Sequence, residues 1–312
     1  MTTRITHRSL YLLTLLFLVI WMTLCLGPSI CAKVKPAQLR VPEAGTTQII
    51  TLRDGSTLTG KIIQVGESEV TFSSTVGEVT IAIDQIDDIR EVSDSSMKGG
   101  KFWFPSPNQG RLYVGPTGRP LKKGTGYFSD ILIFFPSITY GLTKNISAGG
   151  GMSLFPGVDF KHQLFYLFPK VGFQASEQMA IAASMLIVRI PDFDEDDDVI
   201  SDEDQPKVAG ILFGTCTIGS GDKSLTLGLG DGFVDGDFAD KPAVLVGGEY
   251  RVARRMSLVT ENWIFPGVDN PLVSYGVRFF GENLSVDLAL ATVLGADAIF
   301  PGIPMLGFTY NF

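Results

Sequence analysis

The sequence predicts an all-β protein: a transmembrane antiparallel β-barrel of about 12 strands, or about ten, preceded by a small β-barrel domain. Three observations lead to this prediction. An apolar N-terminal segment follows basic residues, as it does in exported proteins. From residue 111 onward, apolar side chains alternate with Gly, Ser, Thr and occasional charges, which is the pattern of membrane barrels. The last residues form one more alternating strand, which ends on an aromatic residue.

The N-terminal segment has the layout of a secretory signal peptide. Arg4 and Arg8 precede an apolar stretch from Leu10 to Leu26, and small residues surround Ala32. We therefore expect cleavage near Ala32, so that residues 1–32 take no part in the fold. A retained N-terminal anchor is the alternative, because the apolar run approaches the length of a membrane-spanning helix.

The charge balance argues against nucleic acid as a partner. The segment 1–32 holds two arginines and no acidic residue, so its removal changes the net charge from −8 to −10. An acidic chain without a basic patch offers no electrostatic footprint for nucleic acid. Cys216 is the one cysteine beyond residue 32, so we expect no intramolecular disulfide. No motif indicates a cofactor.

After an extended lead, residues 33–46, the segment 47–92 consists of short apolar runs joined by sharp turns. Asp54-Gly55 between two such runs is a hairpin signal, and Gly60 interrupts the second run, as at the bend of a small barrel. The stretch from Leu52 to Ile62 resembles SH3-like and Sm-like β-barrels. The resemblance implies a small packing or interaction module, since such folds host many roles. We expect residues 33–110 in the periplasm, where residues 47–92 could contact a periplasmic protein.

Residues 93–110 form a linker rich in Ser, Gly and Pro. Aromatic clusters beside a membrane span often lie at the level of the lipid headgroups. The linker's aromatic cluster either anchors the chain at the barrel rim or packs against the small domain. A second aromatic set precedes Pro-Gly at the ends of predicted strands. The predicted interface aromatics are Phe102, Trp103, Phe104, Phe155, Phe265 and Phe300.

Residues 111–312 are predicted to form the transmembrane barrel. The connections alternate between short and long, and the short ones are expected on the periplasmic side. Strands are expected near 111–117, 127–141, 146–155, 163–175, 179–190, 207–219, 224–231, 243–252, 256–264, 272–280, 283–292 and 304–312.

The hairpin around Gly281-Glu282 predicts which residues face the lumen. A two-residue turn pairs Phe279 with Leu284 and places apolar residues on the lipid face. Charged residues then fall on the other face, where Arg278 and Asp287 lie diagonally across the hairpin. The hairpin through residues 253–255 shows the same division into an apolar and a charged face. Charges confined in a lumen are expected to pair. The predicted lumen-lining residues are Glu249, Arg251, Glu261, Arg278 and Asp287.

The final strand places four apolar residues on one face: Leu306, Phe308, Tyr310 and Phe312. It resembles the C-terminal recognition strand of bacterial outer-membrane proteins. The resemblance implies recognition by the barrel-assembly machinery and a location in the cell outer membrane, among its lipids and lipopolysaccharide.

Few residues suggest catalysis or metal binding. His162 is the one histidine after residue 32, and Ser153, nearby in the sequence, is the candidate nucleophile that could pair with it. We therefore predict that the chain is not an enzyme. The acidic run that includes Asp194, Asp196 and Asp198 could gather calcium. It lacks the fixed intervals of a dedicated calcium site, so a hydrated outer loop is the preferred interpretation.

Two functions remain open. The first is a narrow channel or porin-like transporter of a small solute, favoured by inward glycines at Gly149 to Gly151 and at Gly228 and Gly230. The second is a structural or interaction barrel that anchors a periplasmic module and displays acidic outer loops. A lumen filled by large side chains would favour the second function.

Overall fold

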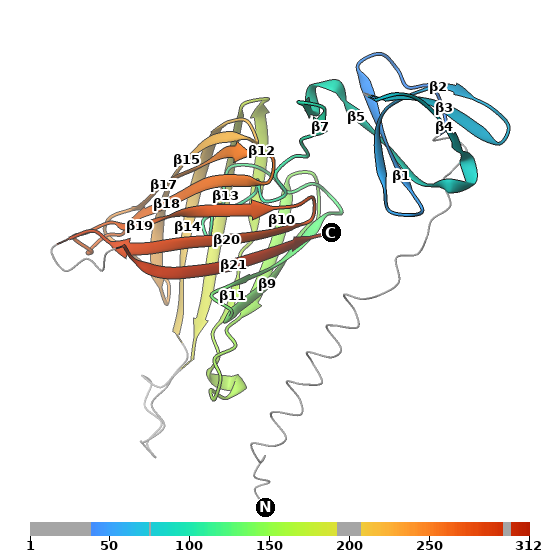
Figure 1. Ribbon diagram of the computed structural model, residues 1–312. Coiled ribbons are helices and arrows are strands. Elements are labelled where there is room, and N and C mark those ends of the chain that lie inside the picture. Colours follow the sequence, from blue (N-terminus) through green and yellow to red (C-terminus); the bar gives the residue numbers. More distant parts are fainter. Residues whose placement is uncertain (1–38, 75, 192–206, 296–300) are drawn as a thin grey trace, which may run out of the picture. The chain divides into compact units, whose positions relative to one another are not determined.

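The computed structural model describes residues 39–74, 76–191, 207–295 and 301–312 (Figure 1). The chain divides into two compact units, Met1–Trp103 and Phe104–Phe312. Within the described ranges, no helix is long and apolar enough to cross a membrane. The predicted signal peptide, Phe300, and the acidic residues Asp194, Asp196 and Asp198 lie outside the described residues.

The N-terminal unit is built on one antiparallel sheet with the strand order β4-β3-β2-β1-β5. The predicted turn at Asp54-Gly55 joins the first two strands, and Gly55 has a φ of 82°, which glycine adopts without strain. Its strands are β1 (Thr46–Leu52), β2 (Thr57–Val65), β3 (Glu69–Ser74), β4 (Gly77–Ala82) and β5 (Ile86–Ser93), followed by β6 (Met97–Lys98) and β7 (Lys101–Phe102).

The core of this unit is aliphatic, with one aromatic ring. Its buried members are Ile50, Ile62, Val70, Phe72, Ile81, Ile86 and Ile89. Gly60 is required where β2 passes β3, because a Cβ atom there would lie 2.0 Å from the carbonyl oxygen of Ser73. The resemblance of this unit to SH3-like or Sm-like barrels and its periplasmic location remain predictions.

The second unit is a closed antiparallel barrel. Its wall strands are β8 (Gly126–Ile131), β9 (Phe135–Gly141), β10 (Ile146–Met152), β11 (Phe165–Leu167) with β12 (Lys170–Ser176), β13 (Met179–Ile190), β14 (Lys207–Gly219), β15 (Lys223–Val234), β17 (Ala243–Ala253), β18 (Met256–Ile264), β19 (Leu272–Phe280), β20 (Leu284–Val293) and β21 (Ile303–Asn311). A short strand, β16 (Asp237–Phe238), extends the loop after β15.

Because β11 and β12 both pair with β10 and β13, they act as one interrupted strand. The described residues therefore contribute 12 strands to the wall. The sheet closes where β21 pairs with β8. Phe312 and Gly126 complete this seam by exchanging two backbone hydrogen bonds, of 2.9 and 2.8 Å. The prediction of an antiparallel barrel of about 12 strands is confirmed.

The membership of the 12 strands differs from the prediction. Residues 111–117 lie outside the wall, and the predicted strand 127–141 is in fact the hairpin of β8 and β9. The two errors cancel in the strand count. The turn at Leu132, Ile133 and Phe134 was missed because it contains none of the Gly, Pro, Asn or Asp residues that mark turns.

The two faces of the wall have opposite character. The outer face exposes large apolar side chains such as Leu212, Leu227 and Leu258. The inner face buries polar residues such as Thr217 and Thr226. Only a closed barrel satisfies all its backbone groups in hydrocarbon, and an apolar exterior around a polar interior is the architecture of a transmembrane β-barrel.

The register of the β19–β20 hairpin corrects the expected one by two residues. Phe279 pairs with Val286 instead of Leu284, and Arg278 lies directly opposite Asp287 instead of diagonally. The strands pair as far as Phe280 and Ser285, so the loop holds more residues than the expected two. A shift of two residues leaves every side chain on its predicted face.

Candidate functional site in the barrel lumen

The barrel interior is occupied by the chain's own residues Phe104–Pro120, which we call the plug. At its centre, Leu112 and Tyr113 are 1% and 3% exposed. They pack against the wall residues Leu245, Val259 and Ala289, which belong to three different strands. The lumen is therefore filled by a segment that precedes the first wall strand.

The sequence of the plug explains why it forms no wall strand. It contains Pro105, Pro107, Pro116 and Pro120, and proline cannot donate to a sheet ladder. Its middle folds back on itself, with hydrogen bonds from Leu112 N–H to Gly115 O and from Thr117 N–H to Gly110 O, of 2.8 and 3.0 Å. Its remaining buried backbone groups need partners from the wall.

Glu261 supplies the largest set of these partners. Its Oε2 accepts the backbone N–H groups of Tyr113 at 2.7 Å and Val114 at 2.9 Å. Its Oε1 accepts Gly115 N–H at 3.0 Å and Trp263 Nε1–H at 2.8 Å. One wall carboxylate thus satisfies a whole turn of the plug, and hydrogen bonds to an ionised acceptor are the stronger kind.

Arg278 links the wall to the plug as a hydrogen-bond donor, whereas Glu261 does so as an acceptor. Its guanidinium group, which is 0% exposed, donates to Asp287 Oδ1 at 2.6 Å and Oδ2 at 3.1 Å. It also donates to Glu249 Oε2 at 2.9 Å and to the plug carbonyl of Leu112 at 2.7 Å. A buried cation with two carboxylate partners and a carbonyl acceptor meets the requirement that buried charges be paired.

Arg251 holds the beginning of the plug. Its Nη1 donates to Asp222 Oδ1 at 2.8 Å and to Phe104 O at 2.9 Å. The ring of Phe104 is 3% exposed and meets Phe280 edge-on, with ring centroids 6.1 Å apart. Phe104 therefore packs inside the barrel, and its expected place among the interface aromatics was wrong.

Three further cations, two of them in the plug itself, connect the plug to the rest of the barrel through uncharged acceptors. Arg119 donates to Gly219 O at 2.9 Å and Ser220 O at 2.6 Å. Lys170 donates to Gly110 O and Arg119 O at 3.0 and 2.7 Å, across the base of the folded-back turn. Arg111 donates to Tyr113 O and to the hydroxyl of Thr309.

The five residues predicted to line the lumen are all buried in the barrel interior. The structure brings Glu249, Arg278 and Asp287 into one cluster, whereas Arg251 and Glu261 bind other parts of the plug. Sequence reasoning missed the plug itself. Pro116, which lies within 111–117, was the signal that could have argued against a wall strand there.

The inward glycines do not leave the expected free space. A Cβ atom on Gly149 would lie 2.1 Å from the ring of Phe168, and one on Gly230 would lie 2.2 Å from Cβ of Phe213. A Cβ atom on Gly228 would lie 3.1 Å from Cβ of Leu245, which is a tight contact. These glycines accommodate neighbouring side chains.

The other predicted interface aromatics and the residues of the final strand have different environments. Phe155 packs against Phe134 and Phe135, and Phe265 stacks on Trp263. Phe102 and Trp103 belong to the N-terminal unit, where Lys98 Nζ lies 4.5 Å from the Trp103 ring centroid. In the final strand, Leu306, Tyr310 and Phe312 are exposed on the exterior and Phe308 is partly buried.

Ser153, which was considered as a catalytic residue, holds a loop in place. The buried hydroxyl of Ser153 donates to Gln163 Oε1 at 2.7 Å and accepts Leu164 N–H at 2.8 Å, which closes the loop after β10. In the described ranges, no group of three or more His, Cys, Asp or Glu residues could hold a metal ion.

No protein-family model and no curated protein matches the sequence. Among solved structures, a loop-deletion form of OmpT, an outer membrane protein of Vibrio cholerae, is 14% identical, with a TM-score of 0.34; the match covers 86% of this chain and 96% of that one. Salmonella typhi OmpF in complex with daunomycin is 10% identical, with a TM-score of 0.31 and coverages of 86% and 95%. The Ralstonia pickettii toluene transporter TbuX is 10% identical, with a TM-score of 0.32 and coverages of 85%.

These neighbours are proteins of the outer membrane or transporters by name, and their TM-scores are too low to indicate a substrate or a role. The prediction that the chain is not an enzyme is withdrawn: forms of OmpT stand among these neighbours, and none of the comparisons supports the absence of an activity.

Proposed function

We propose that the chain is an integral outer-membrane β-barrel whose lumen is closed by its own plug, and that the barrel anchors the N-terminal β-sheet unit. The observation that carries this proposal is the burial of Leu112 and Tyr113 among wall residues of three strands. The apolar exterior supports the membrane location, because exposed leucines on every side would be unfavourable in water.

The polar contacts of the plug support a closed resting state. Withdrawing the plug would remove the acceptor of three backbone N–H groups at Glu261 and one partner of Arg278. An unsatisfied buried polar group costs about 1–3 kcal/mol, and several are involved here. The plug therefore behaves as part of the folded barrel and not as a loop resting in its mouth.

The connection between the two units supports the anchoring role. Phe104, the first plug residue, directly follows Trp103, the last residue of the N-terminal unit. The fixed plug is thus the tether of that unit. In this proposal the N-terminal unit lies in the periplasm and binds a protein there, while membrane lipids and lipopolysaccharide surround the barrel and the barrel-assembly machinery inserts it.

Electrical recording from the purified full-length chain in planar bilayers tests the proposal. We expect the parent protein to give no steady conductance, and Glu261→Ala to produce openings because it frees the central turn of the plug. Glu177→Ala, in the exposed turn after β12, is the matched control and should stay closed. A parent protein that conducts steadily would exclude the closed anchor.

A narrow channel for a small solute is the second candidate. It is favoured by the way Arg119 and Lys170 hold the plug, since both donate to backbone carbonyls that water could replace. A channel of this kind predicts spontaneous brief openings of the parent protein, whereas the anchor predicts openings only in Glu261→Ala.

A further inference from the structure

The strands of the barrel wall are shorter beside its seam. Strand β8 has six residues and β9 seven, whereas β13, β14 and β15 have 12 or 13. The last paired residue of β8 is Ile131, opposite Gly307, but β21 begins four residues earlier, at Ile303. This first part of β21 pairs with β20 and extends beyond the end of β8.

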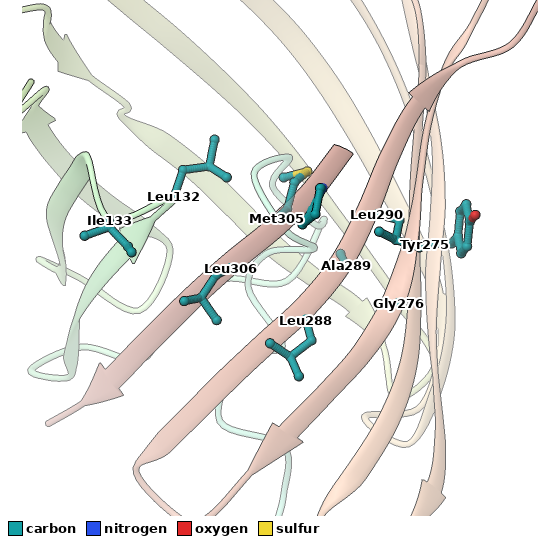
Figure 2. Close-up of a pocket in the computed structure, with 10 residues that line it drawn as sticks. Leu132, Ile133, Tyr275, Gly276, Leu288, Ala289, Leu290, Met305 and Leu306 are labelled. Atoms are coloured by element: carbon teal, nitrogen blue, oxygen red, sulfur yellow. The ribbon is translucent and has the colours of Figure 1, made fainter. Parts of the chain in front are cut away.

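A groove of about 610 Å³ lies at this place (Figure 2). Leu132 and Ile133 at the end of the β8–β9 hairpin form one side, and Leu288 of β20 and Leu306 of β21 lie across from them. The complete lining is Leu132, Ile133, Tyr275, Gly276, Leu288, Ala289, Leu290, Pro304, Met305 and Leu306. None of these residues carries a charge, and all but two are large apolar or aromatic residues.

The strand edge that faces the groove has lost its backbone donor. Even-numbered residues at the end of β21 direct their backbone groups toward β8: Phe312 bonds to Gly126, and Leu306 O accepts Leu132 N–H at 2.7 Å. The next even residue is Pro304, which has no N–H. Proline is the residue that lets this edge face hydrocarbon without an unpaired donor.

The turn beside the groove is apolar and strained. Leu132 and Ile133 have φ values of 58° and 69°, a left-handed conformation that hairpins normally give to Gly or Asn. For a β-branched residue this conformation is an outlier. Ile133 is nevertheless 65% exposed. A strained turn that presents an isoleucine to its surroundings indicates an apolar neighbour.

We propose that this groove binds one acyl chain of a membrane lipid. The inference rests on the proposed insertion into a membrane, because the groove opens onto the apolar exterior and continues the lipid-facing surface of β20 and β21. An acyl chain needs no hydrogen-bond partner, which matches the uncharged lining and the missing donor of Pro304. The short hairpin leaves space for the chain, and Leu132 and Ile133 enclose it on the side of β8.

Photolabelling of the full-length protein in liposomes tests the site. The probe is a phosphatidylcholine that carries a diazirine in one acyl chain, and the labelled residues are identified by mass spectrometry. We expect Leu132, Ile133 and Leu306 to be labelled at least about threefold more than the exterior residues Leu212, Leu227 and Leu229, because a seated chain stays longer than bulk lipid. Equal labelling of the two sets would refute the site.

A variant pair shows whether the groove itself is responsible. Leu288→Trp fills the groove, and Leu227→Trp makes the same change on the distant strand β15; the parent leucines are 48% and 44% exposed. We expect Leu288→Trp alone to reduce labelling at Leu132 and Ile133 to the level of the control residues. Unchanged labelling in Leu288→Trp would overturn the proposal.

Two further readouts separate this inference from the proposed function. Heat-modifiable migration in gels reports insertion independently of labelling. An inserted barrel with uniform labelling rejects the acyl-chain site alone, whereas a chain that fails to insert in liposomes rejects both proposals. In a Cys216→Ala background, a disulfide-linked dimer of Ile133→Cys would show that a second copy occupies the groove, and would also reject the lipid.

Discussion

Arg278 is the residue on which the interior charges depend. It forms ion pairs with both Glu249 and Asp287 and donates to the plug. Removing one partner from a buried ion pair costs about 3–5 kcal/mol, because the other charge stays buried. We therefore expect Arg278→Met to lower the free energy of unfolding of the barrel by about this amount, measured by urea unfolding in detergent micelles.

The control for this prediction is Lys144→Met, in the exposed turn between β9 and β10, which should change stability by no more than about 0.5 kcal/mol. Arg278→Lys keeps the charge but loses the paired geometry with Asp287, so it should fall between the two. Equal stabilities for Arg278→Met and the parent would contradict the conclusion that these buried ion pairs stabilise the barrel.

In the N-terminal unit, two carboxylates make the stability of the folded state depend on pH in the acidic range. Hydrogen bonds from Arg40, of 3.1 and 2.8 Å, lower the pKa of Glu91, and hydrogen bonds from Thr47 and then Lys61 lower the pKa of Asp94. A lowered pKa in the folded state adds stability above the unfolded pKa of about 4. That stability is lost as the pH falls through the lowered values.

We therefore expect amide protection in β1 and β5, measured by hydrogen exchange on the whole protein, to decrease as the pH falls below about 4. Glu91→Gln should reduce this dependence, because it removes one of the two titrating groups. Glu67→Gln, in the exposed turn between β2 and β3, is the control and should retain it. A pH dependence that is identical in all three proteins would count against the two carboxylates.

The sequence could predict the face of each charged residue and the pairing of Arg278 with Asp287, but not the contacts with the plug. Alternation with period two assigned Glu249, Glu261 and Arg278 to the interior. Their contacts with the plug were out of reach, because Glu261 meets backbone groups nearly 150 positions earlier in the chain, at 146 to 148 residues of separation. No local pattern in the sequence encodes a contact at that distance.

At the scale of elements, the seat of the plug is a close fit. Gly118 donates its N–H to Thr217 Oγ1 at 2.8 Å, and a Cβ atom on it would lie 2.2 Å from Ala180 O. The carbonyl belongs to the wall ladder and cannot move away, so Gly118→Ala should displace the plug. In the folded, membrane-inserted variant, we expect trypsin to cleave after Arg111, which the parent protects.

Gly110→Ala is the matched control, because a Cβ atom there meets nothing closer than Arg119 O at 4.0 Å. It should leave the plug as resistant to trypsin as it is in the parent. Cleavage of both variants at the same rate would mean that the fit at Gly118 does not hold the plug.

The β19–β20 hairpin shows what alternation can and cannot predict. Any turn with an even number of residues keeps the same face toward the lipid, so the pattern fixed the faces but not the register. The structure pairs Val277 with Leu288, whereas the two-residue turn paired it with Val286.

Cysteine pairs distinguish these registers. In a Cys216→Ala background, cysteines at 277 and 288 should form a disulfide faster than cysteines at 277 and 286, because directly opposite Cβ atoms are about 4.5–5.5 Å apart and diagonal ones about 7–8 Å. Non-reducing mass spectrometry of the refolded barrel measures both rates. Faster oxidation of the 277 and 286 pair would restore the two-residue turn.

At the scale of the whole molecule, the number of strands was predictable although two strand assignments were wrong. Alternating short and long connections require an even number of strands when both ends of the barrel lie on one side of the membrane. The β8–β9 hairpin replaces two expected strands with two others and keeps this parity. The filled lumen followed from no such rule, because it depends on a segment outside the alternating pattern.

Closure of the barrel provides the last prediction. The seam joins β21 to β8 from Gly307 opposite Ile131 to Asn311 opposite Tyr127, and the bonds between Phe312 and Gly126 end it. The Phe312 ring covers Gly126 so closely that a Cβ atom there would lie 2.7 Å from it. Because the seam pairs the first wall strand with the last along these residues, Phe312→Ala should lower the yield of heat-modifiable, inserted barrel by several-fold. Tyr250→Ala removes an aromatic ring of equal exposure, 52%, from a strand in mid-wall, so it should insert as the parent does. Equal yields from the two variants would show that the ring contributes nothing specific to closure.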